Sequence, residues 1–170
     1  DPKFEQWQAK VIERGWLHPK AVYGYYPCNS DKNDLVVFDP STQRELTRFT
    51  LPRQPRDKRR CIADYFLPIE SGKLDLLAVH LVTMGTIASQ VSQQLFEANL
   101  YDDYLHFHGL SVESAEALAE FIHRRIRTEC GFHHDDAESI EQLFRGGYRG
   151  SRYSFGYPAC PNLEDQLKLF

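Results

Sequence analysis

Residues 21–38 read AVYGYYPCNSDKNDLVVF, and this stretch has the pattern of a β-hairpin. Two runs rich in aromatic and β-branched residues, 21–26 and 35–38, flank a polar cluster at 29–34. Aromatic and β-branched side chains favour strands, whereas clustered Asn, Asp and Ser favour turns. The stretch therefore predicts two antiparallel strands, of which the first ends at Pro27.

Three more strand patterns follow the hairpin. The segment 45–51 alternates polar and apolar residues, as a half-buried strand does. The segments 61–67 and 74–82 are also predicted to be strands, and a turn at Ser71-Gly72 joins them.

Apolar residues at helical spacing predict four helices. The first ends at a Gly15 C-cap, and the second begins after Gly85. The third has Ser111 as its N-cap and ends near Gly131, and a short fourth helix covers 138–144. Strands that come mostly before helices favour an α+β fold, with a mainly antiparallel twisted sheet and long helices packed against it in a single domain.

The composition is that of a soluble globular protein. The 170 residues include 20 basic and 24 acidic side chains, with a formal net charge of −4, and 42% of the residues are hydrophobic. This weakly acidic balance argues against a nucleic-acid partner, and no apolar run approaches the roughly 20 residues that cross a bilayer. Four widely spaced cysteines and the absence of a secretion signal at the first residues indicate a cytoplasmic protein that needs no membrane partner.

One loop carries a run of basic residues. A nucleic-acid module would combine such a run with interleaved aromatic residues, which this loop lacks, so a solvated loop is the favoured interpretation. A second hypothesis is that the loop docks an acidic partner protein through complementary charge. The run consists of Arg53, Arg56, Lys58, Arg59 and Arg60, with Asp57 as its one acidic residue.

Residues 145–161 read RGGYRGSRYSFGYPACP, which is the chemically most unusual stretch of the chain. It combines four glycines and three arginines with several aromatic residues. Glycine lets a backbone approach a ligand closely, and the planar fork of an arginine matches a carboxylate or a phosphate. Composition alone leaves a ligand-binding loop and an ordinary surface turn equally open.

The segment 148–161 resembles the signature of the activation domain of cobalamin-dependent methionine synthase. In that signature, an arginine, three variable residues and Gly-Tyr come before Pro-Ala-Cys-Pro. The similarity continues in the family's order through 23–29, 62–66 and 115–123, so it covers nearly the whole chain.

This resemblance implies a site for S-adenosylmethionine. In the family, the arginine of the signature holds the carboxylate of the cofactor, and Arg152 matches it. Backbone two residues further on contacts the adenosyl part, which corresponds to Ser154, and Gly156 and Tyr157 match the Gly-Tyr pair. A glutamate of the long helix also lines the site, and Glu116 matches it, although its helical spacing alone would indicate a solvated face.

The resemblance also implies a role in reactivation rather than in the main turnover of methionine synthase, the 5-methyltetrahydrofolate–homocysteine methyltransferase. Cobalamin oxidised to cobalt(II) is methylated reductively by S-adenosylmethionine, with an electron from a flavodoxin or a similar flavoprotein. Another domain of the same enzyme is expected to carry the cobalamin, because the chain has no Asp-x-His-x-x-Gly motif. The domain positions the methyl donor, so we assign no catalytic residue and no metal ligand.

The family's activation domain is longer at both ends than residues 1–170. An N-terminal aspartate helps to hold the cofactor's ammonium group, and a C-terminal aromatic residue closes the site. We therefore expect residues 1–170 to be an activation domain that lacks N- and C-terminal parts of the full domain, and to bind S-adenosylmethionine weakly by themselves.

The alternative function is a thiol-dependent enzyme that uses Cys160 or Cys130 with a nearby His. Cys130 lies shortly before His133 and His134, but the spacing matches no standard zinc site and follows a helix, which favours a C-terminal cap. Cys160 lies between prolines without a neighbouring His, which favours a packed small apolar residue.

Overall fold

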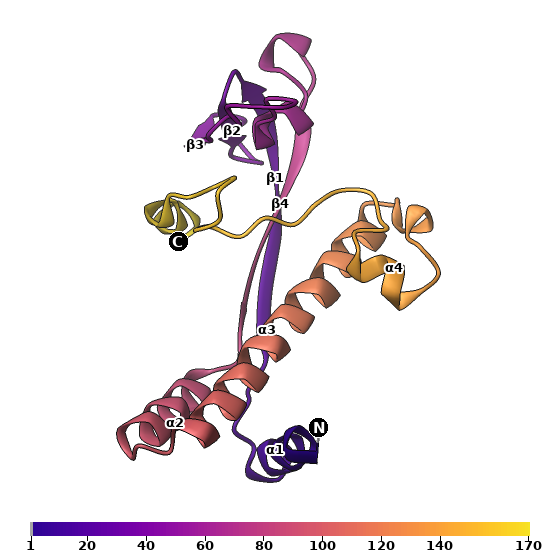
Figure 1. Cartoon of the computed structure of the whole chain (residues 1–170). Coiled ribbons are helices and arrows are strands. Elements are labelled where there is room, and N and C mark those ends of the chain that lie inside the picture. The colour runs from indigo at the N-terminus through magenta and orange to yellow at the C-terminus, as the bar shows by residue number, and fades with distance from the viewer. Residues whose placement is uncertain (1) are drawn as a thin grey trace. The chain divides into compact units, whose positions relative to one another are not determined.

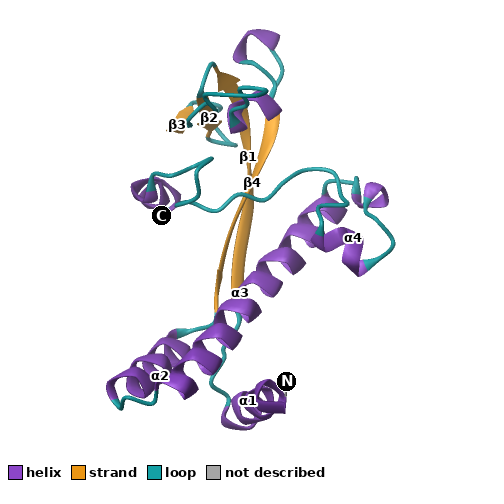
Figure 2. Ribbon diagram, viewed as in Figure 1, coloured by secondary structure: helices purple, strands orange, loops and turns teal. Residues whose placement is uncertain are grey.

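The computed structural model describes residues 2–170, apart from the side chain of Phe144 (Figures 1 and 2). The chain forms two compact units. The helical unit contains the residues up to Tyr23 together with His80–Asp136, and the sheet unit contains Gly24–Val79 and Ala137–Phe170. Each unit is built from separate stretches of the chain: two of the three divisions fall inside long strands, and the third falls in a loop at 136–137.

The sheet has four strands in the order β3-β2-β1-β4, and β2 is antiparallel to both β1 and β3. The predicted hairpin is confirmed, since Asp31 pairs with Asp34 at its turn. The predicted end of the first strand at Pro27 is wrong. Pairing with β2 begins only at Cys28, so the missing N–H of Pro27 removes no bond from that ladder. The strands are β1 (Lys20–Asp31), β2 (Asp34–Phe38), β3 (Glu45–Thr50) and β4 (Asp75–Thr83).

One hydrophobic core lies in the sheet unit. It combines residues of β1, β2 and β3 with residues of two later loops, so the loops are fixed to the sheet by burial. Cys160, from the glycine-rich segment, is one of its members and is 6% exposed. The buried residues are Cys28, Leu35, Val37, Phe49, Leu51, Cys61, Ala63 and Cys160.

The strand predicted over 61–67 is wrong, because a short 3₁₀ helix, η1 (Ile62–Tyr65), occupies this segment. The carboxylate of Asp64 accepts a hydrogen bond from the backbone N–H of Cys61 at 2.9 Å, which closes the turn. Arg53 donates to both oxygens of the same carboxylate, each at 2.6 Å. A side chain that satisfies local backbone donors in this way favours a turn over an extended strand.

Asp64 makes the stability of the sheet unit depend on pH. The hydrogen bonds from Arg53, followed by that from the Cys61 backbone, lower the pKa of Asp64 to about 2. Between about pH 4 and pH 2 the folded state therefore binds fewer protons than the unfolded state, so the stability that Asp64 contributes is complete above about pH 4 and is lost as the pH falls. We expect Asp64→Asn to flatten the decline of the melting temperature in this window.

The measurement is calorimetric melting at a series of pH values. Asp57→Asn serves as the control, because it removes an exposed aspartate from the same charged loop. A decline of equal steepness in wild type and Asp64→Asn would contradict the assignment of this pH dependence to Asp64.

The helical unit has a second core, in which three helices meet. The ring of Phe107 is fully buried and lies 6.0 Å from that of Trp7 and 5.6 Å from that of Trp16, measured between centroids. The first helix ends as predicted, with Gly15 in the left-handed region at φ 61°. The helices are α1 (Pro2–Arg14), α2 (Thr86–Glu97) and α3 (Tyr101–Glu129).

The N-cap predicted at Ser111 is wrong, because α3 runs without a break through this position. The Ser111 hydroxyl donates to the carbonyl of Phe107 at 2.9 Å, one turn earlier in the same helix. Gly109 costs a helix roughly 1 kcal/mol relative to alanine. Burial of the large side chains of Phe107 and Leu110 outweighs that cost, since burying one such side chain contributes about 1.5–3 kcal/mol.

Helix α3 contacts Tyr23 of β1 within the helical unit. The hydroxyl of Tyr23 donates to Glu129 Oε1 at 2.7 Å, and the guanidinium of Arg125 lies 5.6 Å from the centre of the Tyr23 ring. The helices and the four-stranded sheet, with its antiparallel β1–β2 and β2–β3 pairs, confirm the predicted α+β fold.

The remaining elements are short. The predicted helix over 138–144 is observed as α4 (Ile140–Phe144), with the Ser139 hydroxyl accepting from the backbone N–H of Gln142 at 3.2 Å. Within residues 2–170, no helix combines the length and the apolar character that crossing a membrane requires. The other 3₁₀ helices are η2 (Ile69–Ser71), η3 (His133–Asp135) and η4 (Leu163–Leu169).

Candidate cofactor-binding loop

The glycine-rich segment contains a tight turn that is closed by Cys160. The backbone N–H of Gly156 donates to the carbonyl of Cys160, and the N–H of Cys160 donates to the carbonyl of Tyr157, each at 2.9 Å. The Cys160 thiol donates to the carbonyl of Ser154 at 3.0 Å. Three of the five predicted site residues are therefore joined through one buried residue.

The turn requires glycine at position 156. Gly156 has a φ of 97°, a conformation that side-chain-bearing residues rarely adopt. A Cβ atom at this position would also lie 3.0 Å from Cδ2 of Leu163, in η4. Both observations account for a glycine, rather than a residue with a side chain, at position 156.

The turn is anchored on the core of the sheet unit. Phe155 packs against this core, with its ring centre 5.8 Å from that of Phe49. Burial, followed by the charge of Asp165, raises the pKa of the Cys160 thiol, so the thiol stays protonated and can donate near neutral pH. This environment suits a packed residue and disfavours Cys160 as a nucleophile.

The predicted site residues of this segment are accessible to a ligand. Ser154, Gly156 and Tyr157 are exposed, and Arg152, two residues before Ser154, is half-buried. Arginine offers a planar set of donors, and Tyr157 offers an aromatic face that is 63% exposed. The segment therefore presents a cation, an aromatic ring and backbone polar groups within a few residues.

Glu116 lies on α3 in the helical unit, whereas the other four predicted site residues lie in the sheet unit. Its side chain is exposed, while Ala119 and Ile122, on the apolar stripe of the same helix, are buried. Its participation in one site with Arg152 stays a prediction.

A buried charged cluster near the end of α3 was not predicted from the sequence. Arg127 is 1% exposed and donates to both oxygens of Asp136 at 2.8 Å. Its third hydrogen bond goes to Nδ1 of His123, at 2.9 Å. The spacing of His123 and Arg127 places them on one helix face, but no local pattern links either residue to Asp136.

The segment that follows α3 was weighed as a thiol site, as a metal site and as a helix cap. Gly131 has a φ of 81°, and Cys130 and Phe132 donate their backbone N–H groups to carbonyls of α3, so the favoured C-terminal cap is confirmed. Burial, followed by the charge of Glu129, raises the pKa of Cys130, which disfavours a reactive thiolate. Across the described part of the chain, no three His, Cys, Asp or Glu side chains are placed to hold a metal ion.

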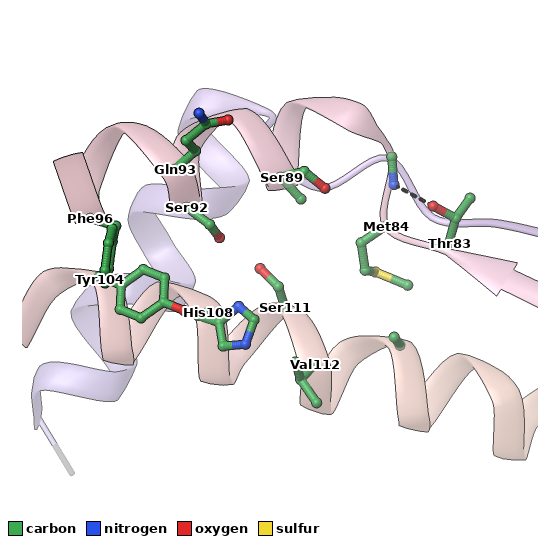
Figure 3. Close-up of a pocket in the computed structure, with 13 residues that line it drawn as sticks. Thr83, Met84, Ser89, Ser92, Gln93, Phe96, Tyr104, His108, Ser111 and Val112 are labelled. Atoms are coloured by element: carbon green, nitrogen blue, oxygen red, sulfur yellow. Dashed lines mark hydrogen bonds between the residues drawn. The ribbon is translucent and has the colours of Figure 1, made fainter. Parts of the chain in front are cut away.

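A cavity of about 520 Å³ lies in the helical unit between α2 and α3 (Figure 3). Ser89, Ser92 and Ser111 project into the space between these helices, beside the stacked rings of Tyr104 and His108. Among the described residues 2–170, no Asp, Glu, Lys or Arg lines the cavity, and Glu116 is not part of it. It therefore lacks the charged groups that would hold the carboxylate and ammonium of S-adenosylmethionine.

Comparison with known proteins identifies the family. The family model described as "Vitamin B12 dependent methionine synthase, activation domain" matches residues 5–170. The chain belongs to this activation-domain family. The resemblance carried by the Arg-x-x-x-Gly-Tyr and Pro-Ala-Cys-Pro residues is thereby confirmed.

Two curated relatives are the methionine synthases of Mycobacterium tuberculosis and Mycobacterium leprae. Each is 43% identical to this chain over 181 aligned positions, which include 99% of the chain. The chain spans only 15% of the length of either relative.

One solved structure shares the fold of this activation-domain chain. It is the crystal structure of the MetH reactivation domain bound to AdoHcy, with a TM-score of 0.87 and 26% sequence identity. The similarity covers 99% of this chain and 54% of the other chain.

Proposed function

We propose that this chain binds S-adenosylmethionine and serves in the reactivation of cobalamin-dependent methionine synthase. The observation that carries the proposal is the likeness, over 99% of the chain, to a reactivation domain bound to AdoHcy. AdoHcy is the molecule that remains when S-adenosylmethionine has given up its methyl group. A protein of the same fold that holds AdoHcy supports a site of the same kind here.

The charged groups of the chain fit the charged groups of this ligand. S-adenosylmethionine carries a carboxylate and an ammonium group at one end, so a site needs one fixed cation and one anion. Arg152 supplies a guanidinium that can donate two parallel hydrogen bonds to the carboxylate. We propose that Glu116 accepts from the ammonium group.

The backbone of the turn fits the adenosyl part. The carbonyl of Ser154 accepts one hydrogen bond, from the Cys160 thiol, and an oxygen of this type has a second lone pair. That lone pair can accept from an amino group of adenine. We propose that Tyr157 and Gly156 complete the site, with an exposed ring and a backbone that leaves room for the ligand.

The chain contributes position rather than acid–base chemistry. When bound, S-adenosylmethionine supplies the methyl group, which passes to the cobalt of cobalamin as a flavodoxin or similar flavoprotein supplies an electron. We propose that another domain of the same enzyme presents the cobalamin, and that the enzyme works in the cytoplasm. Holding the methyl donor beside the metal makes the encounter effectively unimolecular, which accounts for much of the rate advantage of bound reactants.

The test of the proposal is a calorimetric titration of S-adenosylmethionine into the complete natural polypeptide that contains residues 1–170. We expect saturable binding of one molecule per chain, and competition by AdoHcy. An absence of saturable binding would contradict the proposed function.

The basic loop is our candidate for the surface that meets the flavoprotein. Arg53 is engaged within the loop, since it bonds to the Asp64 carboxylate and to the carbonyl of Arg59 at 2.7 Å. The other four basic side chains are exposed, which suits an acidic partner. These four are Arg56, Lys58, Arg59 and Arg60.

Charge reversal tests this docking surface. We expect Arg59→Glu combined with Arg60→Glu to slow electron transfer from an acidic flavodoxin about tenfold or more at low salt, because electrostatic steering is lost. The control is Lys20→Glu combined with Arg44→Glu, which makes the same charge change at exposed positions outside the loop. A rate that is unchanged and insensitive to salt would remove the loop from consideration.

A further inference from the structure

Cys160 connects the residues that the proposed function places around S-adenosylmethionine. Its thiol donates to the carbonyl of Ser154, its N–H donates to the carbonyl of Tyr157, and its own carbonyl accepts from Gly156. The three distances are 3.0, 2.9 and 2.9 Å. Cys160 itself is 6% exposed and belongs to the core of the sheet unit.

We propose that Cys160 is a positioning residue, whose buried thiol holds the carbonyl of Ser154 in the orientation that receives the adenosyl part of S-adenosylmethionine. The inference rests on the proposed function. Cys160 does not touch the ligand in this arrangement. It acts by tying the exposed turn to the sheet core, so that less conformational freedom is lost when the ligand binds.

The hydrogen bond from the Cys160 thiol to Ser154 is the contact that a side chain without a donor would not reproduce. The two backbone hydrogen bonds can be made by almost any residue at this position, whereas the bond to Ser154 depends on a side chain that can donate. Pro158 and Pro161 flank the residue and have no N–H, so they cannot provide a replacement donor. The raised pKa of Cys160 keeps the proton on the sulfur near neutral pH.

We expect variants at position 160 to lose affinity for S-adenosylmethionine when the side chain cannot donate a hydrogen bond, whatever its volume. In the complete natural polypeptide, Cys160→Ala should raise the calorimetric Kd for S-adenosylmethionine about five- to tenfold, the scale of one hydrogen bond. Cys160→Ser keeps a donor and should restore the Kd to within about threefold of wild type.

Cys28→Ala is the matched control. Cys28 is 0% exposed and packs in the same core, but it lies in β1 and makes no contact of this kind with the turn. We expect Cys28→Ala to lower the melting temperature while it leaves the Kd within about twofold of wild type. A merely structural role of Cys160 would instead give the two alanine variants the same effect on affinity.

Amide hydrogen exchange without ligand supplies a second readout. The N–H of Gly156 bonds to the carbonyl of Cys160, so its exchange should be faster in Cys160→Ala and unchanged in Cys28→Ala. A wild-type Kd in Cys160→Ala, an equal rise of Kd in Cys28→Ala, or an unchanged exchange rate at Gly156 would each overturn the inference. If wild type itself fails to bind S-adenosylmethionine, the proposed function is wrong and the inference falls with it.

Discussion

Replacing Arg152 by alanine should weaken the binding of S-adenosylmethionine by about 1.5–3 kcal/mol, the scale of a hydrogen bond to a charged group. The carboxylate of the ligand would lose a planar pair of donors that no neighbouring uncharged side chain can replace. The measurement is a calorimetric titration of the variant beside wild type, at one ionic strength.

Two controls make this result specific. Arg145→Ala removes an exposed arginine from the same glycine-rich segment and should leave the affinity nearly unchanged. Decarboxylated S-adenosylmethionine lacks the group that Arg152 is proposed to hold, so Arg152→Ala should cost little with this ligand. An equal loss with both ligands would show that Arg152 does not hold the carboxylate.

Replacing Arg127 by alanine should destabilise the helical unit by about 3–5 kcal/mol, the scale for removing one partner of a buried ion pair. The side chains of Arg127 and Asp136 are 2% and 10% exposed, so Asp136 would keep its charge with little access to water. The hydrogen bonds from Arg127 lower the pKa of Asp136, because they favour the charged form of its carboxyl group. The measurement is the free energy of unfolding from denaturant titration.

Arg125→Ala is the control for this prediction. Arg125 lies on the same helix and pairs with Glu129 at 2.9 Å, but its side chain is 58% exposed. Exposed pairs of this type contribute about 0–1 kcal/mol. Equal losses for Arg125→Ala and Arg127→Ala would mean that the cluster around Arg127 is not the stabilising feature that its burial indicates.

The parts of the fold that depend on local signals could be predicted from the sequence. The polar cluster between two strand patterns gave the hairpin, and glycine at a helix end gave the caps at Gly15 and Gly131, which both have positive φ. The family signature supplied the site residues around Arg152. Three of these residues, Ser154, Gly156 and Tyr157, are joined in one hydrogen-bonded turn.

The errors arose where a distant partner outweighs the local pattern. The 61–67 segment reads as a strand, but the pairing of Asp64 with Arg53 stabilises a 3₁₀ turn. Ser111 reads as a helix start, but burial of Phe107 keeps α3 continuous through it. The partners that decide each case are distant in the sequence, since Asp64 pairs with Arg53 and Phe107 packs against Trp7 and Trp16.

The interactions that the sequence did not reveal are of the same kind. Arg127 pairs with Asp136 across the end of a helix. The thiol of Cys160 donates to a backbone carbonyl, and because every residue has such a carbonyl, the sequence does not show which one is the acceptor. Sequence reasoning placed Cys160 in the glycine-rich segment without showing what its thiol binds.

The most direct measurement is a crystal structure of the complete natural polypeptide with S-adenosylmethionine bound. We expect the guanidinium of Arg152 at about 3 Å from the ligand's carboxylate, and a carboxylate oxygen of Glu116 at a similar distance from its ammonium group. A structure in which the ligand lies away from the turn at 152–157, or in which either side chain points away from it, would contradict the proposed site.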